Sequence, residues 1–133
     1  MIFIDSNVII GAFNPRDKYH KEAAKIIRRY DEGVFEGVIT DYIMDEILTF
    51  IRRRSSPETS IDVLNYILSS DLIIMKTDRK TIDASYHIFR TYKNLSFTDS
   101  TVVVFMKNNG IKKIISFDER FDSVDGIERI SEI

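Results

Sequence analysis

The stretch MIFIDSNVII, residues 1–10, contains the strand, the turn and the helix start from which we read the fold. Its first four residues are apolar, as in a short strand that is covered on both faces. Asp5, Ser6 and Asn7 follow at once, and each is a good N-cap for a helix over residues 8–13. The stretch therefore predicts a buried strand with a carboxylate at its end.

Short apolar runs and helix-like segments alternate along the rest of the chain. The β-like runs are residues 1–4, 37–40, 72–76, 113–117 and 127–130, and helical spacing marks residues 18–30, 41–53, 60–69, 81–92 and 98–107. The first, third and fourth runs are apolar enough to be covered on both faces. We therefore expect a single α/β domain over residues 1–133, with a central, mostly parallel sheet of about five strands flanked by helices.

The composition limits the chemistry that the chain can use. Of 133 residues, 44% are hydrophobic and 30% are charged, as in a globular protein with one core. There is no cysteine and there are two histidines, so a metal ion would be bound mainly by oxygen. The formal net charge of -2 gives no strong field to attract nucleic acid, so recognition of phosphate would need local basic groups.

The sequence carries no signal for export or for membrane insertion. No apolar run approaches the ~18 residues that span a bilayer, and no basic leader precedes Asp5. We therefore expect no contact with membranes and a cytoplasmic location.

Two aspartates directly follow apolar runs and are candidate metal ligands. Because parallel sheets bind ligands beyond the carboxyl ends of their strands, Asp5 and Asp118 should share one crevice. The alternative is a helix N-cap for Asp5 and a turn or cap for Asp118. Asp122 lies close by in the sequence and is a second candidate for the place of Asp118.

Two further acids belong to predicted helices. Glu46 lies at the border of the apolar face of residues 41–53, a face to which we assign Phe50. Its carboxylate could point into the crevice or could instead pair with Arg53. Asp99 lies in the first turn of residues 98–107, where a carboxylate also suits the helix dipole.

Acids at two strand ends and on two helices could converge on one cleft of such a sheet. Four carboxylates within a few ångströms raise one another's pKa and cannot all stay ionised unless cations compensate them. Ligation by oxygen alone favours Mg²⁺ or Mn²⁺ over zinc. A site of this kind suits hydrolysis of a phosphodiester.

Five segments of the chain resemble PIN domains and, among these, the VapC-type toxins of prokaryotic toxin–antitoxin pairs. The segments are IDSNVII (4–10), DKYHKEA (17–23), TDYIMDEI (40–47), LSFTDS (95–100) and ISFDERFD (115–122). Each is short, but all five occur in order over nearly the whole chain. The resemblance implies a PIN-like three-layer fold, Mg²⁺- or Mn²⁺-dependent endonucleolytic cleavage of RNA, frequent homodimers and inhibition by a small antitoxin.

The resemblance also assigns residues by position. The family's acidic quartet corresponds to Asp5, Glu46, Asp99 and Asp118, and the polar residues that support the metal site correspond to Ser6, Asn7 and Ser116. The implied substrate is RNA, in a single strand or a loop, and the implied protein partner is a VapB-like antitoxin. All four acids are present, which argues against an inactive member of the family.

Two other classes of α/β domain also place an aspartate after their first strand. Haloacid-dehalogenase-like phosphatases need a second aspartate two residues after the first, where this chain has Asn7, and a receiver domain needs an acidic pair near its first strand. A PIN-like module that binds RNA or protein without cutting, and a solitary PIN nuclease without an antitoxin, remain as alternatives.

Several other groups have a simpler structural interpretation. The basic run 52–54 either stabilises the end of its helix or contacts RNA phosphates. His20 is expected to be structural. Tyr86, Phe89 and Tyr92 recur at helical spacing, which is typical of a core or a subunit interface.

Overall fold

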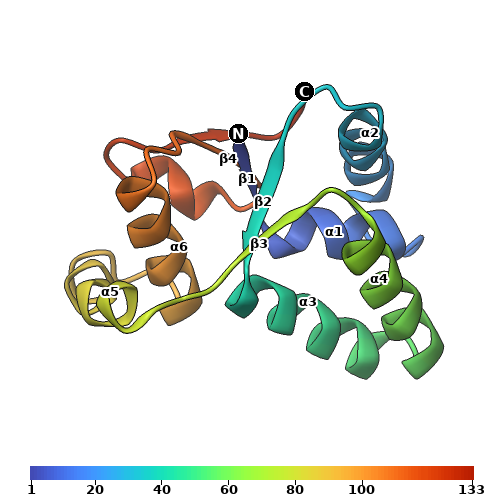
Figure 1. Ribbon diagram of the computed structural model, residues 1–133, viewed down its shortest axis with the longest axis horizontal. Helices are drawn as coiled ribbons and strands as arrows, with labels where there is room; N and C mark the ends of the chain where they lie inside the picture. The colour runs from blue at the N-terminus through green and yellow to red at the C-terminus, as the bar shows by residue number, and fades with distance from the viewer.

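The computed structural model describes residues 1–133, which form one parallel five-stranded sheet between two layers of helices (Figure 1). The strands lie in the order β3-β2-β1-β4-β5, and every neighbouring pair is parallel. Their bounds are β1 (Ile2–Ile4), β2 (Gly37–Thr40), β3 (Ile73–Met75), β4 (Lys113–Ile115) and β5 (Glu128–Ile130). The expected α/β class with five strands is confirmed.

Six α-helices and one 3-10 helix connect the strands. Their bounds are α1 (Ser6–Phe13), α2 (His20–Asp31), α3 (Asp41–Arg54), α4 (Pro57–Ser69), α5 (Arg79–Thr91), α6 (Phe97–Asn108) and the 3-10 helix η1 (Glu119–Ser123). In Figure 1, α1 to α4 lie on one side of the sheet, and α5 and α6 lie on the other. The strands are therefore covered on both faces, as a parallel sheet requires.

The strand order reverses at β1, which lies in the middle of the sheet. The chain runs from β1 outward to β2 and β3, then crosses to β4 on the other side of β1 and ends at β5. Phe3 of β1 pairs with Val38 of β2 and with Ile114 of β4. In open α/β sheets a ligand crevice forms at such a reversal, beyond the carboxyl ends of the two diverging strands.

The core lies on both sides of β1, β2 and β4. All residues of β1 and β2 are buried, and the Phe3 ring packs edge-on against Phe105 of α6 with 5.9 Å between ring centroids. Helix α6 is buried over residues 99–106, as its apolar sequence predicts. The helix that leads to one candidate acid, Asp99, is thus fixed by packing on nearly all sides.

Two expectations about the core were wrong. The run at residues 72–76 was expected to be covered on both faces, but β3 is an edge strand in which Ile74 and Met75 are exposed. An edge strand has a neighbour on one side only, and a short apolar run cannot reveal which strand takes the edge. Phe50 was assigned to the apolar face of α3, yet 42% of it is exposed. That face is narrower than expected and consists of Ile43, Ile47 and Ile51.

Other surface features follow from the same packing. Tyr86 and Phe89 of α5 are exposed, so they do not belong to the core of this chain, whereas Tyr92 is partly buried against it. The Nδ1 atom of His20 lies 2.8 Å from the carbonyl oxygen of Gly11, which is a structural contact between α2 and α1. None of the helices has the length and the apolar character needed to span a bilayer.

Candidate active site

Asp5 lies where β1 ends and α1 begins, and its suggested role as a helix N-cap is confirmed. It is the N-cap of α1, and its Oδ1 accepts a hydrogen bond of 2.8 Å from the backbone N–H of Ser6. It is 4% exposed, and burial raises the pKa of its carboxyl group from 3.8 to about 7. A buried carboxylate of this kind gains strongly from a nearby cation.

A polar network joins the end of β1 to the end of β4. Ser116 Oγ donates to Asp5 Oδ2 at 2.5 Å, and Asn7 Nδ2 donates to the same oxygen at 2.9 Å. Asn7 Oδ1 accepts from the backbone N–H of Phe117 at 3.2 Å, and Ser116 Oγ accepts from the backbone N–H of Asp118 at 3.0 Å. These contacts place Ser6, Asn7 and Ser116 around Asp5 and fix both oxygens of its carboxylate.

Asp99 lies in the first turn of α6 and is 8% exposed. It forms a capping box with Ser96, in which Asp99 Oδ2 accepts from the backbone N–H of Ser96 at 3.1 Å and Ser96 Oγ accepts from that of Asp99 at 3.0 Å. Burial raises the pKa of Asp99, and the nearby charge of Asp118 raises it further. Asp99 therefore caps α6, and it also lines the same cavity as Asp5.

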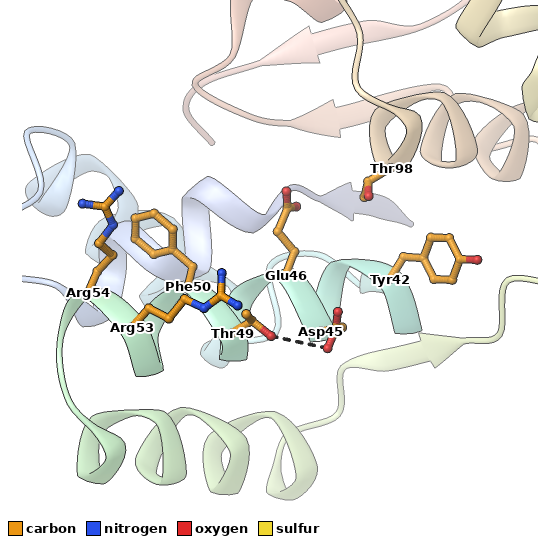
Figure 2. A pocket seen from close by; sticks show the side chains of 8 residues that line it. All are labelled: Tyr42, Asp45, Glu46, Thr49, Phe50, Arg53, Arg54 and Thr98. Carbon is orange, nitrogen blue, oxygen red and sulfur yellow. Dashed lines mark hydrogen bonds between the residues drawn. The ribbon is translucent and has the colours of Figure 1, made fainter.

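Glu46 projects from the middle of α3. Figure 2 shows its carboxylate pointing away from α3 toward the first turn of α6, where Thr98 lies. The residue as a whole is exposed, but loss of water around the carboxylate raises its pKa, and the charge of Asp99 adds to this. No ion pair joins Glu46 to Arg53, so the alternative role in such a pair is wrong.

The structure separates Asp118 from Asp122. Asp118 is the N-cap of η1, and Arg120 holds it through Nη2 at 2.6 Å and Nε at 2.9 Å, a pairing that lowers the pKa of Asp118. Asp122 is exposed and pairs instead with Arg129, whose Nε lies 2.7 Å from Asp122 Oδ1. Asp118 lines the cavity that the other acids share, and Asp122 does not.

One cavity of about 340 Å³ gathers the predicted acids. Its lining comprises Asp5, Ser6, Asn7, Ile10, Asp17, Glu46, Phe50, Ser96, Asp99, Asp118 and Arg120. Asp17, Ser96 and Arg120 belong to this lining although no pattern in the sequence marked them as site residues. The pattern Ser-x-x-Asp at Ser96 is a capping-box signal that could have placed this serine beside Asp99.

The lining has the donor chemistry of a hard divalent cation, since it offers carboxylate and hydroxyl oxygens and no sulfur. Three of its carboxyl groups have raised pKa values, mainly because they are shielded from water and to a lesser extent because neighbouring carboxylates repel their charge. No three acidic or histidine side chains stand where they could hold one ion together. The capping box of Asp99 and the Arg120 pairing of Asp118 direct these two carboxylates to partners within the chain.

Comparison with known proteins agrees with this geometry. The sequence pattern of the PIN domain matches residues 2–127. Ribonuclease VapC13 of Mycobacterium tuberculosis is 28% identical over 138 residues, an alignment that covers 98% of this chain and 100% of the relative.

Two solved structures share the fold at lower sequence identity. VapC20 of Mycobacterium tuberculosis, described as a toxin that cleaves the sarcin-ricin loop, superposes with a TM-score of 0.81 at 18% identity over 92% of this chain and 94% of its own. A toxin–antitoxin complex from Klebsiella pneumoniae contains a chain with a TM-score of 0.73 at 15% identity, with full coverage of both chains.

Proposed function

This chain belongs to the PIN domain family, and we propose that it is a metal-dependent endoribonuclease that cleaves single-stranded or looped RNA. One observation carries the proposal: Asp5, Glu46, Asp99 and Asp118 come from four separate parts of the chain and line one cavity at the switch point of the sheet. Asp5 and Asp99 are both buried there, and two buried carboxylates are costly in the absence of a cation.

We propose that Asp5, Glu46, Asp99 and Asp118 would hold Mg²⁺ or Mn²⁺ after their side chains turn toward the ion, with Asp122 left outside. When bound, such an ion would make water a better nucleophile and would neutralise charge on the phosphodiester. Ser6, Asn7 and Ser116 keep both oxygens of Asp5 in a fixed orientation, which orients a ligand without further loss of entropy on binding. Arg120 lines the same cavity and pairs with Asp118, and its guanidinium could donate to a phosphate oxygen of the substrate there.

The named relatives support a more specific role. Because a VapC ribonuclease and a chain of a toxin–antitoxin complex are among the proteins that this chain resembles, we propose that it is the toxin of a VapBC-type pair in the cytoplasm. A VapB-like antitoxin would then be its protein partner. We further propose a homodimer that covers Tyr86 and Phe89, two exposed aromatic residues of α5. Co-purification with the product of a neighbouring short reading frame tests the first point, and sedimentation of a Tyr86→Ser/Phe89→Ser variant tests the second.

Cleavage of RNA is tested with the purified protein and a single-stranded RNA, with and without Mn²⁺. We expect cleavage by the wild type in Mn²⁺, none after chelation, and none by Asp5→Asn. Asp62→Asn is the matched control, because Asp62 is exposed on α4 and lines neither the acidic cavity nor its neighbour. Binding of RNA with equal, negligible cleavage by the wild type and Asp5→Asn would instead support a module that binds RNA without cutting it.

A further inference from the structure

A second and larger cavity, of about 600 Å³, adjoins the acidic one (Figure 2). It runs along the exposed face of α3 and reaches Thr98 in the first turn of α6. Glu46 and Phe50 line both cavities, so they mark the place where one opens into the other. A polymer that leaves the acidic cavity on this side must pass over Phe50.

Two arginines with no partner follow Phe50 on α3. Arg53 and Arg54 are exposed, line the second cavity and take part in no ion pair or side-chain hydrogen bond. Arg52, by contrast, donates from Nε to Ser60 Oγ at 3.1 Å. Figure 2 shows the Phe50 ring and the side chain of Arg54 rising on the same side of α3 as Glu46. The chain as a whole is slightly acidic, so this pair is a local source of positive charge.

The spacing of these residues places them on one path. Phe50 follows Glu46 by four residues, and Arg53 and Arg54 follow Phe50 by three and four, so all project from neighbouring positions on α3. The backbone of Arg54 lies roughly 12 Å along the helix axis from that of Glu46. Figure 2 shows Arg54 on the far side of the Phe50 ring, and the guanidinium of Arg53 turned back along α3 toward Glu46. The two arginines are therefore within reach of phosphates on either side of a base that lies over Phe50.

We propose that this groove, defined by Phe50, Arg53 and Arg54, binds the single-stranded RNA beside the scissile bond. A base stacks on the exposed ring of Phe50, and two backbone phosphates contact Arg53 and Arg54. The inference rests on the proposed ribonuclease function and adds to it the path of the substrate. It requires an unpaired strand, because a base inside a duplex has no free face to stack on a side chain.

The charges in the groove give the strand a direction. Asp45 also lines the groove, toward the beginning of α3, and accepts a hydrogen bond of 3.4 Å from Thr49 Oγ1. Figure 2 shows this contact, with Asp45 far from Arg54 along the helix. No cation pairs with Asp45, so phosphates are repelled at that end and attracted at the other. The RNA therefore leaves the acidic cavity toward the C-terminus of α3.

Binding of a fluorescent single-stranded RNA oligonucleotide, measured by anisotropy without divalent cations, tests the groove apart from catalysis. We expect Arg53→Gln/Arg54→Gln to weaken binding about tenfold or more and to reduce the slope of log K against log salt by about 1.4, because each phosphate contact to a single strand contributes about 0.7. The matched control is Arg28→Gln/Arg29→Gln, which removes the same charge from the last turn of α2, outside both cavities.

The stacking contact is tested with Phe50→Leu, which keeps an apolar side chain but removes the ring. We expect about tenfold weaker binding of the RNA, and equal binding of the wild type and the variant to an abasic oligonucleotide. Phe50 is partly exposed, so the variant should keep the fold, and far-ultraviolet circular dichroism checks this.

These results separate the groove from the proposed reaction. Equal losses in the α2 control and the α3 variant, or unchanged binding in Phe50→Leu and the α3 variant, would overturn the inference and leave a protein partner as the occupant of the groove. If the wild type binds RNA in the predicted way but does not cleave it in Mn²⁺, the groove is supported and the ribonuclease function fails. If the wild type cleaves RNA but the substitutions of Phe50, Arg53 and Arg54 do not weaken binding, the ribonuclease function is supported and the groove is not.

Discussion

Replacement of Asp5 by asparagine should stabilise the fold while it abolishes the proposed activity. The pKa of Asp5 is about 7 in the folded chain against an ordinary value of 3.8, and burial is the main cause. Since each tenfold change in acid strength corresponds to about 1.36 kcal/mol, the buried charge destabilises the fold by roughly 4 kcal/mol at alkaline pH. Asn7 and Ser116 both lose the acceptor Oδ2 in the variant, which costs about 2 kcal/mol at about 1 kcal/mol for each hydrogen bond. The expected net gain is roughly 2 kcal/mol in the free energy of unfolding.

The gain must depend on pH in a defined direction. A carboxyl group whose folded-state pKa is raised costs nothing below its ordinary pKa, and the wild type loses stability as the pH rises from 3.8 to about 7. Asparagine does not ionise, so its contribution to stability does not change with pH. The difference in unfolding free energy between the two proteins should therefore grow over that range and then stay constant.

Urea unfolding in a chelator, followed by circular dichroism at several pH values from about 4 to about 8, measures this difference. Asp62→Asn on the exposed face of α4 should change stability by less than about 0.5 kcal/mol at every pH. Mn²⁺ should stabilise the wild type more than the variant at alkaline pH, because the ion binds the folded state through the carboxylate. Parallel stability curves for the wild type and Asp5→Asn would refute the assignment of a costly buried charge to this residue.

Three further predictions use other parts of the structure. Asp118→Asn should reduce RNA cleavage in Mn²⁺ by more than about 100-fold, whereas Asp122→Asn, outside the cavity, should leave the rate within a few fold; the reverse order would exchange their roles. Arg120→Gln should lower the unfolding free energy at neutral pH by about 1 kcal/mol. That loss should disappear as the pH falls through the lowered pKa of Asp118, and a loss that persists in acid would show a packing effect instead. Gly37→Ala should cost about 1–3 kcal/mol in thermal unfolding, because its Cβ would lie 2.7 Å from the Cδ1 of buried Ile4; an unchanged Tm would show that the sheet yields there.

Local patterns in the sequence predicted most of the elements of the fold. The predicted strand at residues 37–40 has the bounds of β2, and each of the other strands lies within its predicted run. The alternation of strands and helices predicted a parallel sheet, because a parallel pair needs a crossover long enough to hold a helix. The same logic placed Asp5 and Asp118 at one end of the sheet, since each follows a strand that points the same way.

The extent of burial was harder to predict, because it depends on neighbours that are distant in the sequence. Residues 73–75 are as apolar as those of β1, but β3 has a single neighbouring strand and remains exposed. Phe50 fits the period of the apolar face of α3, but the elements packed on α3 cover only a narrow stripe around Ile47. Helical periodicity gives the direction of a side chain and cannot tell how far the neighbouring element extends.

The sequence by itself determined the class of the fold, the candidate acids and the absence of any cysteine ligand, because these depend on residue type and on periodicity along the chain. Only the tertiary structure decided that Asp118 and not Asp122 lines the acidic cavity and that Arg120 lies there with it. The structure also decided that Phe50 lines a second cavity together with two unpaired arginines. Asp118 and Asp122 are four residues apart, and the partner of each is fixed by the direction in which η1 turns after β4 and by the position of Arg129 on β5. Such contacts form between segments that are distant in the sequence, so local sequence patterns cannot predict them.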